Sequence, residues 1–528
     1  MNLRLSLLIF FFLLHSTISH KFLFYETAFA RSHVQFAGKL IDVLVEEGHT
    51  VDILMLAYNP TITTNGTNNA RRIYHVHPKN GEESYWMKMP HFESPFIRNK
   101  RIESKDLFDK ALEQFCDAVT DAGLIEELRA EHYDAGFAMI YEMCPFGLFH
   151  LLNIKPVIGY MATAMPNMVS NALHLPSPPS YVLNNLRNNG AGYEMSFFER
   201  LMHLVHQLND DLFALPKSAH VITNLFRRKF GKDFPESDKL MAEISMVFSN
   251  SEKVTDACRP ISHKIKYIGG IQSQSSKPLS KEFKELYDRS QYGVILFSFG
   301  SLLQTSLVPR EVKENFLRAF KRFPQYTFVW KYDELEADAE MFKNYSNVYP
   351  TKWMSQYDLL SDKRTHAFIT HLGQNSYLEV SNAGIPVVAV PLFVDQLFNS
   401  ALAMQKGIGV RIDRFNLTEE SIYEALHEVI SNPQYRKNAR KISKMLKTQP
   451  FPARDVFVKN VEYLVANPDV GAHYQFPSVY MPYWKEHSLD VVSFVVFSSV
   501  FVISSILYVT LRLSHLLKFV VYKKKKCD

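Results

Sequence analysis

The sequence has few cysteines and little net charge, and each scarcity excludes a class of protein. Four cysteines in 528 residues, Cys116, Cys144, Cys258 and Cys527, are too few and too scattered for a disulfide framework. No two of them have the close spacing of a zinc site. The 59 Lys and Arg against 54 Asp and Glu leave a net charge of only +5, and the excess lies in a lysine run at 523–526. A nucleic-acid partner is therefore not expected.

Long apolar runs without charge lie at the two ends of the chain. Residues 1–20 combine Arg4, an apolar run and then small residues, which is the layout of a secretory signal peptide. Residues 491–511 form an uncharged stretch long enough to cross a bilayer as one helix. The basic tail at 512–528 follows directly, so the positive-inside rule predicts type I topology with a lumenal body and a cytosolic tail.

Short signals indicate the compartment. Lys525 and Lys526, fourth and third from the end, resemble the dilysine signal that returns membrane proteins to the endoplasmic reticulum. The alternative is a simple stop-transfer charge cluster. Sequons at Asn65, Asn344 and Asn416 favour lumenal exposure and predict N-glycosylation. We therefore expect a single-pass protein of the endoplasmic reticulum membrane.

Strands alternate with helices in both halves of the lumenal chain. Apolar segments at 21–26 and 51–56 flank a stretch with helical spacing, and the pattern restarts at 293–301 after a Gly, Ser and Pro-containing segment. An α/β fold of two Rossmann-like domains facing across a cleft is expected. The predicted divisions are an N-terminal domain at 21–270, a linker at 271–285, a C-terminal domain at 286–465 and a segment leading to the membrane at 466–490.

The segment after the strand "AFIT" is predicted to bind phosphate. His371 and Gly373 precede a helix that begins around Asn375, so free backbone N–H groups and the positive end of the helix dipole converge there. Glu379 lies one turn further on the same face, where a carboxylate accepts hydrogen bonds from a ribose diol. A second glycine turn, "SFGS", brings Ser301 toward the same phosphates.

Other polar residues complete a nucleotide-sugar pattern. Asp395 and Gln396 follow the next strand and suit sugar hydroxyls, while Trp353 and Gln356 suit a flat base. Each residue alone has an ordinary interpretation as a cap, a solvated face or core. Their order and spacing together favour a binding site. Near these motifs no run of carboxylates suited to a metal diphosphate occurs, so neither a metal nor a cofactor is expected.

These motifs resemble those of the UDP-glycosyltransferases, specifically the animal UDP-glucuronosyltransferase type. Within that type the sequence resembles a nematode-like member. The residues that carry the resemblance are His371, Gly373, Glu379, Pro386, Pro391, Asp395 and Gln396, together with "VILFSFGS" and "RPISHKIKYIGGI". The resemblance covers nearly the whole chain. It implies a GT-B fold, UDP-glucuronic acid or UDP-glucose as donor, a small lipophilic acceptor, and inverting transfer in detoxification or conjugation. It also allows homo- or hetero-oligomers with relatives.

The resemblance implies a role for each motif residue. Trp353 and Gln356 would hold uracil, Glu379 the ribose, His371, Asn375 and Ser301 the diphosphate, and Asp395 and Gln396 the sugar. The catalytic base would be His33. Its place at the amino end of a helix supports this independently, because the helix dipole disfavours the imidazolium and keeps the ring able to accept a proton.

The sequence departs from the family at Met139 and Leu372, and in smaller ways at Ser355, where proline is usual, and Lys331, where arginine is common. A carboxylate on the strand after "YD" orients the family's histidine, and the matching residue here is Met139. Glu142 substitutes for it only if the strand ends first, because an odd offset on a strand reverses the face. A second interpretation is therefore a non-catalytic UDP-sugar or lipophile binding protein, or an accessory subunit. Leu372 replaces a small residue, which is costly if the turn needs positive φ.

Residues 195–213 read as an amphipathic helix with Phe197, Phe198, Leu201, Leu204 and Val205 on one side. Such a stripe more often faces a core. The alternatives are that it rests on the membrane or lines an apolar acceptor site.

Overall fold

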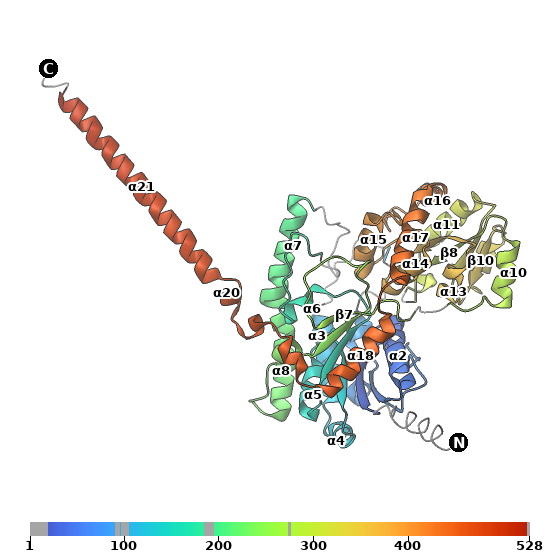
Figure 1. Cartoon of the computed structure of the whole chain (residues 1–528). Helices are drawn as coiled ribbons and strands as arrows, with labels where there is room; N and C mark the ends of the chain where they lie inside the picture. The colour runs from blue at the N-terminus through green and yellow to red at the C-terminus, as the bar shows by residue number, and fades with distance from the viewer. Residues whose placement is uncertain are drawn as a thin grey trace, which may run out of the picture. The chain divides into compact units, whose positions relative to one another are not determined.

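Figure 1 shows the computed structural model, which describes residues 19–89, 95–96, 105–183, 195–272, 276–301 and 303–524. The chain divides into two units, Met1–Gln475 and Phe476–Asp528. Nearly all of the expected signal peptide lies outside the described residues, as do Lys525 and Lys526. The signal peptide and the retrieval signal stay predictions.

The first half of the larger unit is built on a seven-stranded parallel sheet, in the order β3-β2-β1-β4-β5-β6-β7. Its five inner strands are buried along almost their whole length, as expected where helices cover both faces, whereas the edge strands β3 and β7 are partly exposed. The strands are β1 (Lys21–Thr27), β2 (Thr50–Leu56), β3 (Arg72–Val76), β4 (Ala135–Met139), β5 (Val157–Met161), β6 (Met246–Ser249) and β7 (Ile265–Tyr267). The helices are α2 (Arg31–Glu46), α3 (Lys105–Val119), α4 (Ala122–Ala130), α5 (Cys144–Leu152), α6 (Asn167–Ala172), α7 (Phe197–Asn209), α8 (Leu215–Phe230) and α9 (Ser237–Ala242).

The second half is built on a six-stranded parallel sheet, in the order β10-β9-β8-β11-β12-β13. Alternate residues of its strands enter two apolar clusters on opposite faces, Leu296 in one and Phe297 in the other. The strands are β8 (Val294–Ser298), β9 (Thr327–Lys331), β10 (Val348–Thr351), β11 (Thr365–Thr370), β12 (Val387–Ala389) and β13 (Gly409–Arg411). The helices are α10 (Lys281–Arg289), α11 (Arg310–Lys321), α12 (Ala339–Phe342), α13 (Gln356–Ser361), α14 (Gln374–Ala383), α15 (Asp395–Gln405), α16 (Glu419–Ser431) and α17 (Pro433–Lys447). The predicted α/β fold with two parallel sheets is confirmed.

The chain returns to the first sheet after α17. Helix α18 (Ala453–Ala466) was assigned to the C-terminal domain by the sequence, but Figure 1 shows it beside α2. The Phe457 ring lies 4.9 Å from that of Phe248 and 6.3 Å from that of Phe137, both on strands of the first sheet. Arg454 pairs with Glu46 and Glu47. The short helix α19 (Val470–His473) follows, and residues 453–466 therefore cover the N-terminal domain.

A disulfide joins Cys116 of α3 to Cys144, the first residue of α5. The scattered cysteines had suggested no disulfide framework, and a single crosslink of this kind was not predicted. The two residues are 28 positions apart, so only the packing of α3 against α5 brings them together. Disulfides persist in oxidising compartments, which agrees with the expected lumenal location.

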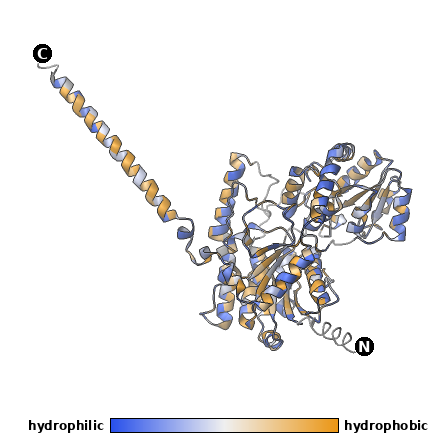
Figure 2. Ribbon diagram, viewed as in Figure 1, coloured by the Kyte–Doolittle hydropathy of each residue, from blue (hydrophilic) through white to orange (hydrophobic). Residues whose placement is uncertain are grey.

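The smaller unit consists of α20 (Tyr483–Glu486) and the long helix α21 (Leu489–Lys524). Within the described residues, α21 is the one helix long and apolar enough to cross a membrane, over Leu489–Val520 at a mean hydropathy of 2.3. The predicted span at 491–511 lies inside it. Figure 2 shows the apolar residues that dominate this helix.

The apolar stripe on α7 is exposed, so the core interpretation is wrong. Phe197 and Phe198 are 65% and 74% exposed, and Leu201, Leu204 and Val205 are exposed as well. Figure 2 shows apolar and polar residues interleaved along this helix. None of these five side chains lines the cavity described below.

Candidate active site

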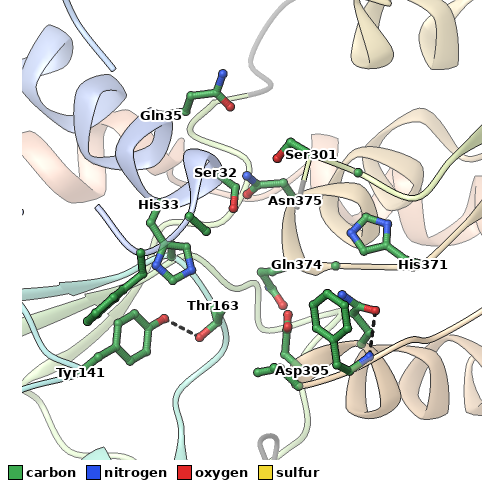
Figure 3. A pocket seen from close by; sticks show the side chains of 18 of the residues that line it. Ser32, His33, Gln35, Tyr141, Thr163, Ser301, His371, Gln374, Asn375 and Asp395 are labelled. Atoms are coloured by element: carbon green, nitrogen blue, oxygen red, sulfur yellow. Dashed lines mark hydrogen bonds between the residues drawn. The ribbon is translucent and has the colours of Figure 1, made fainter. Parts of the chain in front are cut away.

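A cavity of about 890 Å³ lies between the two sheets of the larger unit (Figure 3). The first half lines it with the loops after β1, β4 and β5, and the second half with the turns after β8, β11 and β12. These loops follow the carboxyl ends of parallel strands, where open α/β sheets bind their ligands. Every predicted catalytic or UDP-sugar residue lines this cavity: His33, Glu142, Ser301, Trp353, Gln356, His371, Gly373, Asn375, Glu379, Asp395 and Gln396.

The turn between β11 and α14 is shaped for an anion. Leu372 adopts φ 60°, its N–H donates to the Thr370 hydroxyl at 3.1 Å, and Gly373 precedes the first residue of α14. The turn therefore does need positive φ, so the bulky residue at position 372 carries the backbone strain that was expected from the sequence. Burial of the leucine side chain offsets that strain, because Leu372 is fully buried in the core. The amino end of α14 faces the cavity with its N–H groups and dipole.

The turn after β8 lies against His371. Gly300 has φ 81°, and a Cβ there would be 2.6 Å from the His371 ring, so only glycine fits. Burial lowers the pKa of His371 to about 4, which makes the ring neutral at physiological pH. The Lys331 ammonium donates to the Gly300 carbonyl at 2.8 Å and brings a cation to this turn. Ser301 and Asn375 line the same end of the cavity, as Figure 3 shows.

Glu379 and Gln356 are already paired. The Gln356 amide donates to the Glu379 carboxylate at 2.5 Å and to the Ser376 hydroxyl at 3.1 Å. Burial raises the pKa of Glu379 to about 7. Trp353 is 56% exposed, and the Arg31 guanidinium from the first half lies 5.2 Å from its ring centroid. A flat base would compete with Arg31 for this ring.

Asp395 and Gln396 are the first two residues of α15, and the residue before them has a strained backbone. Val394 adopts φ 54°, which is rare for a β-branched residue, and such strain concentrates at functional sites. Asp395 accepts from Asn399 at 3.0 Å, and burial raises the pKa of Asp395 to about 6. The Gln396 amide oxygen accepts from the backbone N–H of Leu392 and Phe393. Only the amide nitrogen of Gln396 is therefore left to donate to a sugar.

His33 lies in the first turn of α2 and faces the cavity (Figure 3). Its ring stacks on Tyr141 with centroids 5.4 Å apart, and burial lowers the pKa of His33 to about 4. The Tyr141 hydroxyl lies 2.7 Å from the Thr163 hydroxyl, which itself donates to the Ala164 carbonyl. Tyr141 is therefore the donor, and its oxygen keeps lone pairs for other partners. Sequence reasoning missed both residues, since nothing in their local spacing marks them.

The surroundings of Met139 show whether another carboxylate takes the place of the one that the family has at this position. Met139 is fully buried, and its sulfur accepts from the Thr27 hydroxyl at 3.0 Å. Strand β4 ends at Met139, so Glu142 does lie beyond the strand. However, Glu142 accepts from Tyr58 at 3.3 Å, and in the described part of the chain no hydrogen bond or ion pair joins it to His33. Burial raises the pKa of Glu142 to about 8. Its substitute role stays a prediction.

The three sequons differ in exposure. Asn344 and Asn416 are exposed, whereas Asn65 is half-buried. Thr67 of the first sequon is buried and hydrogen-bonded to Asp42. Glycosylation at each site stays a prediction.

A family model described as UDP-glucoronosyl and UDP-glucosyl transferase matches residues 21–527. The chain belongs to this family. Among curated relatives of this UDP-glycosyltransferase is the putative UDP-glucuronosyltransferase ugt-48 of Caenorhabditis elegans, 28% identical over 509 residues, with 92% of this chain and 94% of the relative covered. Another is the UDP-glucuronosyltransferase 1A7 of Mus musculus, 28% identical over 408 residues, with 76% of this chain and 74% of the relative covered.

Solved structures show the fold of this UDP-glycosyltransferase to be GT-B. The glycotransferase of kitacinnamycin aligns with a TM-score of 0.59 at 17% identity, covering 84% of this chain and 99% of that chain. The calicheamicin glycosyltransferase CalG4 aligns with a TM-score of 0.58 at 16% identity, covering 85% and 99%. The fold expected from the resemblance is thus confirmed.

Proposed function

We propose that this chain transfers glucuronic acid or glucose from the UDP-sugar to small lipophilic acceptors, with inversion at the anomeric carbon. One observation carries the proposal: a single cavity holds a neutral, buried histidine on one wall and the amino end of α14 with Glu379 on the other. The first wall suits an acceptor and the second suits a UDP-sugar.

The proposed reaction is a displacement. Nε2 of His33 accepts the proton of the acceptor hydroxyl as its oxygen attacks the anomeric carbon of the sugar. The new carbon–oxygen bond forms while the bond to the diphosphate breaks, and the electron pair leaves with UDP. The amino end of α14, with His371, Asn375 and Ser301, stabilises the growing charge on the phosphates. Attack opposite the leaving group inverts the configuration, and the proposed step needs no metal.

The acceptor wall is largely apolar. Phe29, Trp86, Met89, Phe108 and Leu112 line this part of the cavity. Aromatic and aliphatic side chains favour the binding of apolar small molecules. Phenols and similar compounds are therefore the proposed acceptors.

The proposed location is the endoplasmic reticulum membrane, with the larger unit in the lumen. The apolar helix α21, the following basic residues and the disulfide support it. N-glycosylation at Asn344 and Asn416 and association with relatives belong to the same proposal.

The test is UDP release by membranes that contain the full chain. UDP-glucose and UDP-glucuronic acid are offered separately with a panel of phenols, beside a His33→Ala variant. We expect UDP release with at least one donor and at least about a hundredfold loss in the variant, since general base catalysis contributes about 10²–10⁴. Equal rates in both proteins would refute the role of His33.

Met139 favours one alternative function. Without a carboxylate at that position, the chain could retain UDP-sugar or lipophile binding and act as a binding protein or accessory subunit. Saturable UDP binding without turnover of either donor would support this alternative. If co-expression with this chain changed the rate of an active relative, the result would support the role of an accessory subunit.

A further inference from the structure

Glu26 at the end of β1 is a buried carboxyl group for which the proposed reaction has so far no use. It is fully buried, and its Oε2 accepts from the Tyr160 hydroxyl at 2.6 Å. Its Oε1 has no hydrogen-bond partner within the described residues. Burying a carboxyl group with an unsatisfied oxygen is costly, so such a group calls for an explanation.

The strand register places Glu26 beside Met139. Strands β1 and β4 run parallel with Tyr25 opposite Ala138, so the next pair is Glu26 and Met139. Met139 in turn lies opposite Tyr160 on β5. Paired residues of parallel strands point to the same face, so these three side chains form a row across the sheet. The hydrogen bond from Tyr160 to Glu26 passes across the position of Met139. The carboxyl group of Glu26 therefore lies at the end of β4, where Met139 supplies none.

The histidine has a matching unsatisfied atom. Nδ1 of His33 is buried and has no hydrogen-bond partner within the described residues. The ring stacks on Tyr141, two residues beyond Met139. Burial raises the pKa of Tyr141, and it also raises the pKa of Glu26 to about 8, although the hydrogen bond with Tyr160 opposes this shift. Glu26 is therefore mostly protonated at neutral pH, and a positive charge on the neighbouring His33 ring favours its ionised form.

We propose that Glu26 supplies from β1 the carboxylate that the family resemblance places on β4, and that it is the positioning residue for His33. This inference rests on the proposed function. When His33 accepts the acceptor proton, its ring becomes positive and Nδ1–H becomes a charge-assisted donor. The unsatisfied Oε1 of Glu26 is the corresponding acceptor. Catalytic hydrogen bonds often tighten only when substrate binds, so the pair forms in the ternary complex.

The first test is Glu26→Gln in the full chain, which keeps the size of the side chain and a hydrogen-bond acceptor for Tyr160 but cannot ionise when the His33 ring becomes positive. We expect kcat to fall at least about a hundredfold with KM for the UDP-sugar unchanged, because loss of the orienting carboxylate in a comparable triad costs about 10⁴. The matched control is Glu252→Gln, another buried glutamate, which is hydrogen-bonded to Gln449 far along the chain. The control should retain its kcat.

The second test moves the carboxylate back to β4. The double variant Glu26→Gln/Met139→Glu should have a kcat at least about tenfold higher than that of Glu26→Gln. A purely structural role for Glu26 would not be rescued in this way, since Met139→Glu puts a carboxyl group in place of a buried apolar side chain, which by itself destabilises the fold. If Glu26→Gln does not fold, Tyr160→Phe tests the same contact, because it removes only the hydroxyl that holds Glu26. We expect it to lower kcat several-fold without a change in KM.

The outcomes separate this inference from the proposed function. No turnover by the unaltered chain counts against the transferase itself. Turnover by the unaltered chain with an unchanged kcat in Glu26→Gln overturns the role of Glu26. A loss in Glu142→Gln together with an unchanged Glu26→Gln also overturns it, and assigns the carboxylate to Glu142 instead. An unchanged kcat in Tyr160→Phe, where Glu26→Gln does not fold, has the same meaning.

Discussion

Two residues at the donor end of the cavity, Leu372 and Val394, adopt positive φ although neither is glycine. Positive φ costs such residues about 1–2 kcal/mol. Leu372 recovers this by burial, whereas Val394 is half exposed and gains less. Both flank positions predicted to hold the UDP-sugar. The strain therefore lies where the backbone must approach a ligand closely.

The strain at Leu372 predicts an unusual order of stability. Leu372→Ala and Leu372→Gly both lose the buried side chain, but only glycine relieves the backbone. We expect Leu372→Gly to be more stable than Leu372→Ala by about 1 kcal/mol. Thermal unfolding of the purified variants measures the difference. Leu296, buried in the extended strand β8, is the control, and there the alanine variant should be more stable than the glycine variant. The same order at both positions would contradict the account.

The raised pKa of Glu379 gives a dependence of stability on pH. The folded protein binds this proton more tightly than the unfolded chain, where the pKa is 4.5. The stabilising contribution is therefore complete below pH 4.5 and is lost as the pH rises through about 7. Glu379→Gln removes this loss. We expect the unfolding temperature of the variant, relative to the unaltered chain, to rise between pH 5 and pH 8.

The same variant should bind UDP more weakly. An ionised Glu379 accepts hydrogen bonds from the ribose hydroxyls, and such bonds to a charged group are worth about 1.5–3 kcal/mol. We expect the Kd for UDP to rise about ten- to a hundredfold at pH 8, measured by calorimetry. An unchanged Kd would remove Glu379 from the ribose site.

At the scale of secondary structure, the donor half of the site was predictable because it follows local rules. His371, Gly373, Asn375 and Glu379 lie within a single strand, turn and helix, so their spacing alone indicates a phosphate and ribose site. Tyr141, Thr163 and Glu26 come from three different segments. Their contacts depend on how β1, β4 and β5 align, which local spacing does not reveal. The acceptor half was therefore only partly predicted.

The disulfide between α3 and α5 predicts a loss of stability on its removal. Closing a loop of this length stabilises a protein by about 3.6 kcal/mol in the loop-entropy model. We expect Cys116→Ala/Cys144→Ala to unfold at a clearly lower temperature than the unaltered chain. Cys258→Ala, which leaves the disulfide in place, is the control. Equal unfolding temperatures in the double variant and the unaltered chain would show that the crosslink adds no stability.

At the scale of the whole molecule, the sequence predicted both sheets and the apolar carboxyl helix, because alternating strands and helices and a long uncharged run are strong signals. It did not predict that α18 returns to the first sheet. That return depends on Phe457 meeting Phe137 and Phe248, residues more than 200 positions earlier in the chain. It also read the α7 stripe as a core face, since periodicity reports an apolar face but not what covers it.

Helix α21 and the α7 stripe together predict two modes of membrane attachment. We expect the full chain to resist extraction by alkaline carbonate and a chain ending at Gln475 to be released. The shortened chain should still bind lipid vesicles weakly through α7, and Phe197→Ser/Phe198→Ser should abolish that binding. Phe451→Ser, an exposed aromatic elsewhere, is the control. Equal vesicle binding by all three shortened chains would contradict a membrane role for α7.

The central claim is that this chain forms a new glycosidic bond with His33 as base. The most direct measurement is NMR of the product formed from a phenol and a ¹³C-labelled UDP-sugar with an α-linked donor carbon. We predict a β-linked glycoside that His33→Ala does not form. An α-linked product would contradict the displacement mechanism. A protein that binds UDP but forms no glycoside with either donor would contradict the transferase.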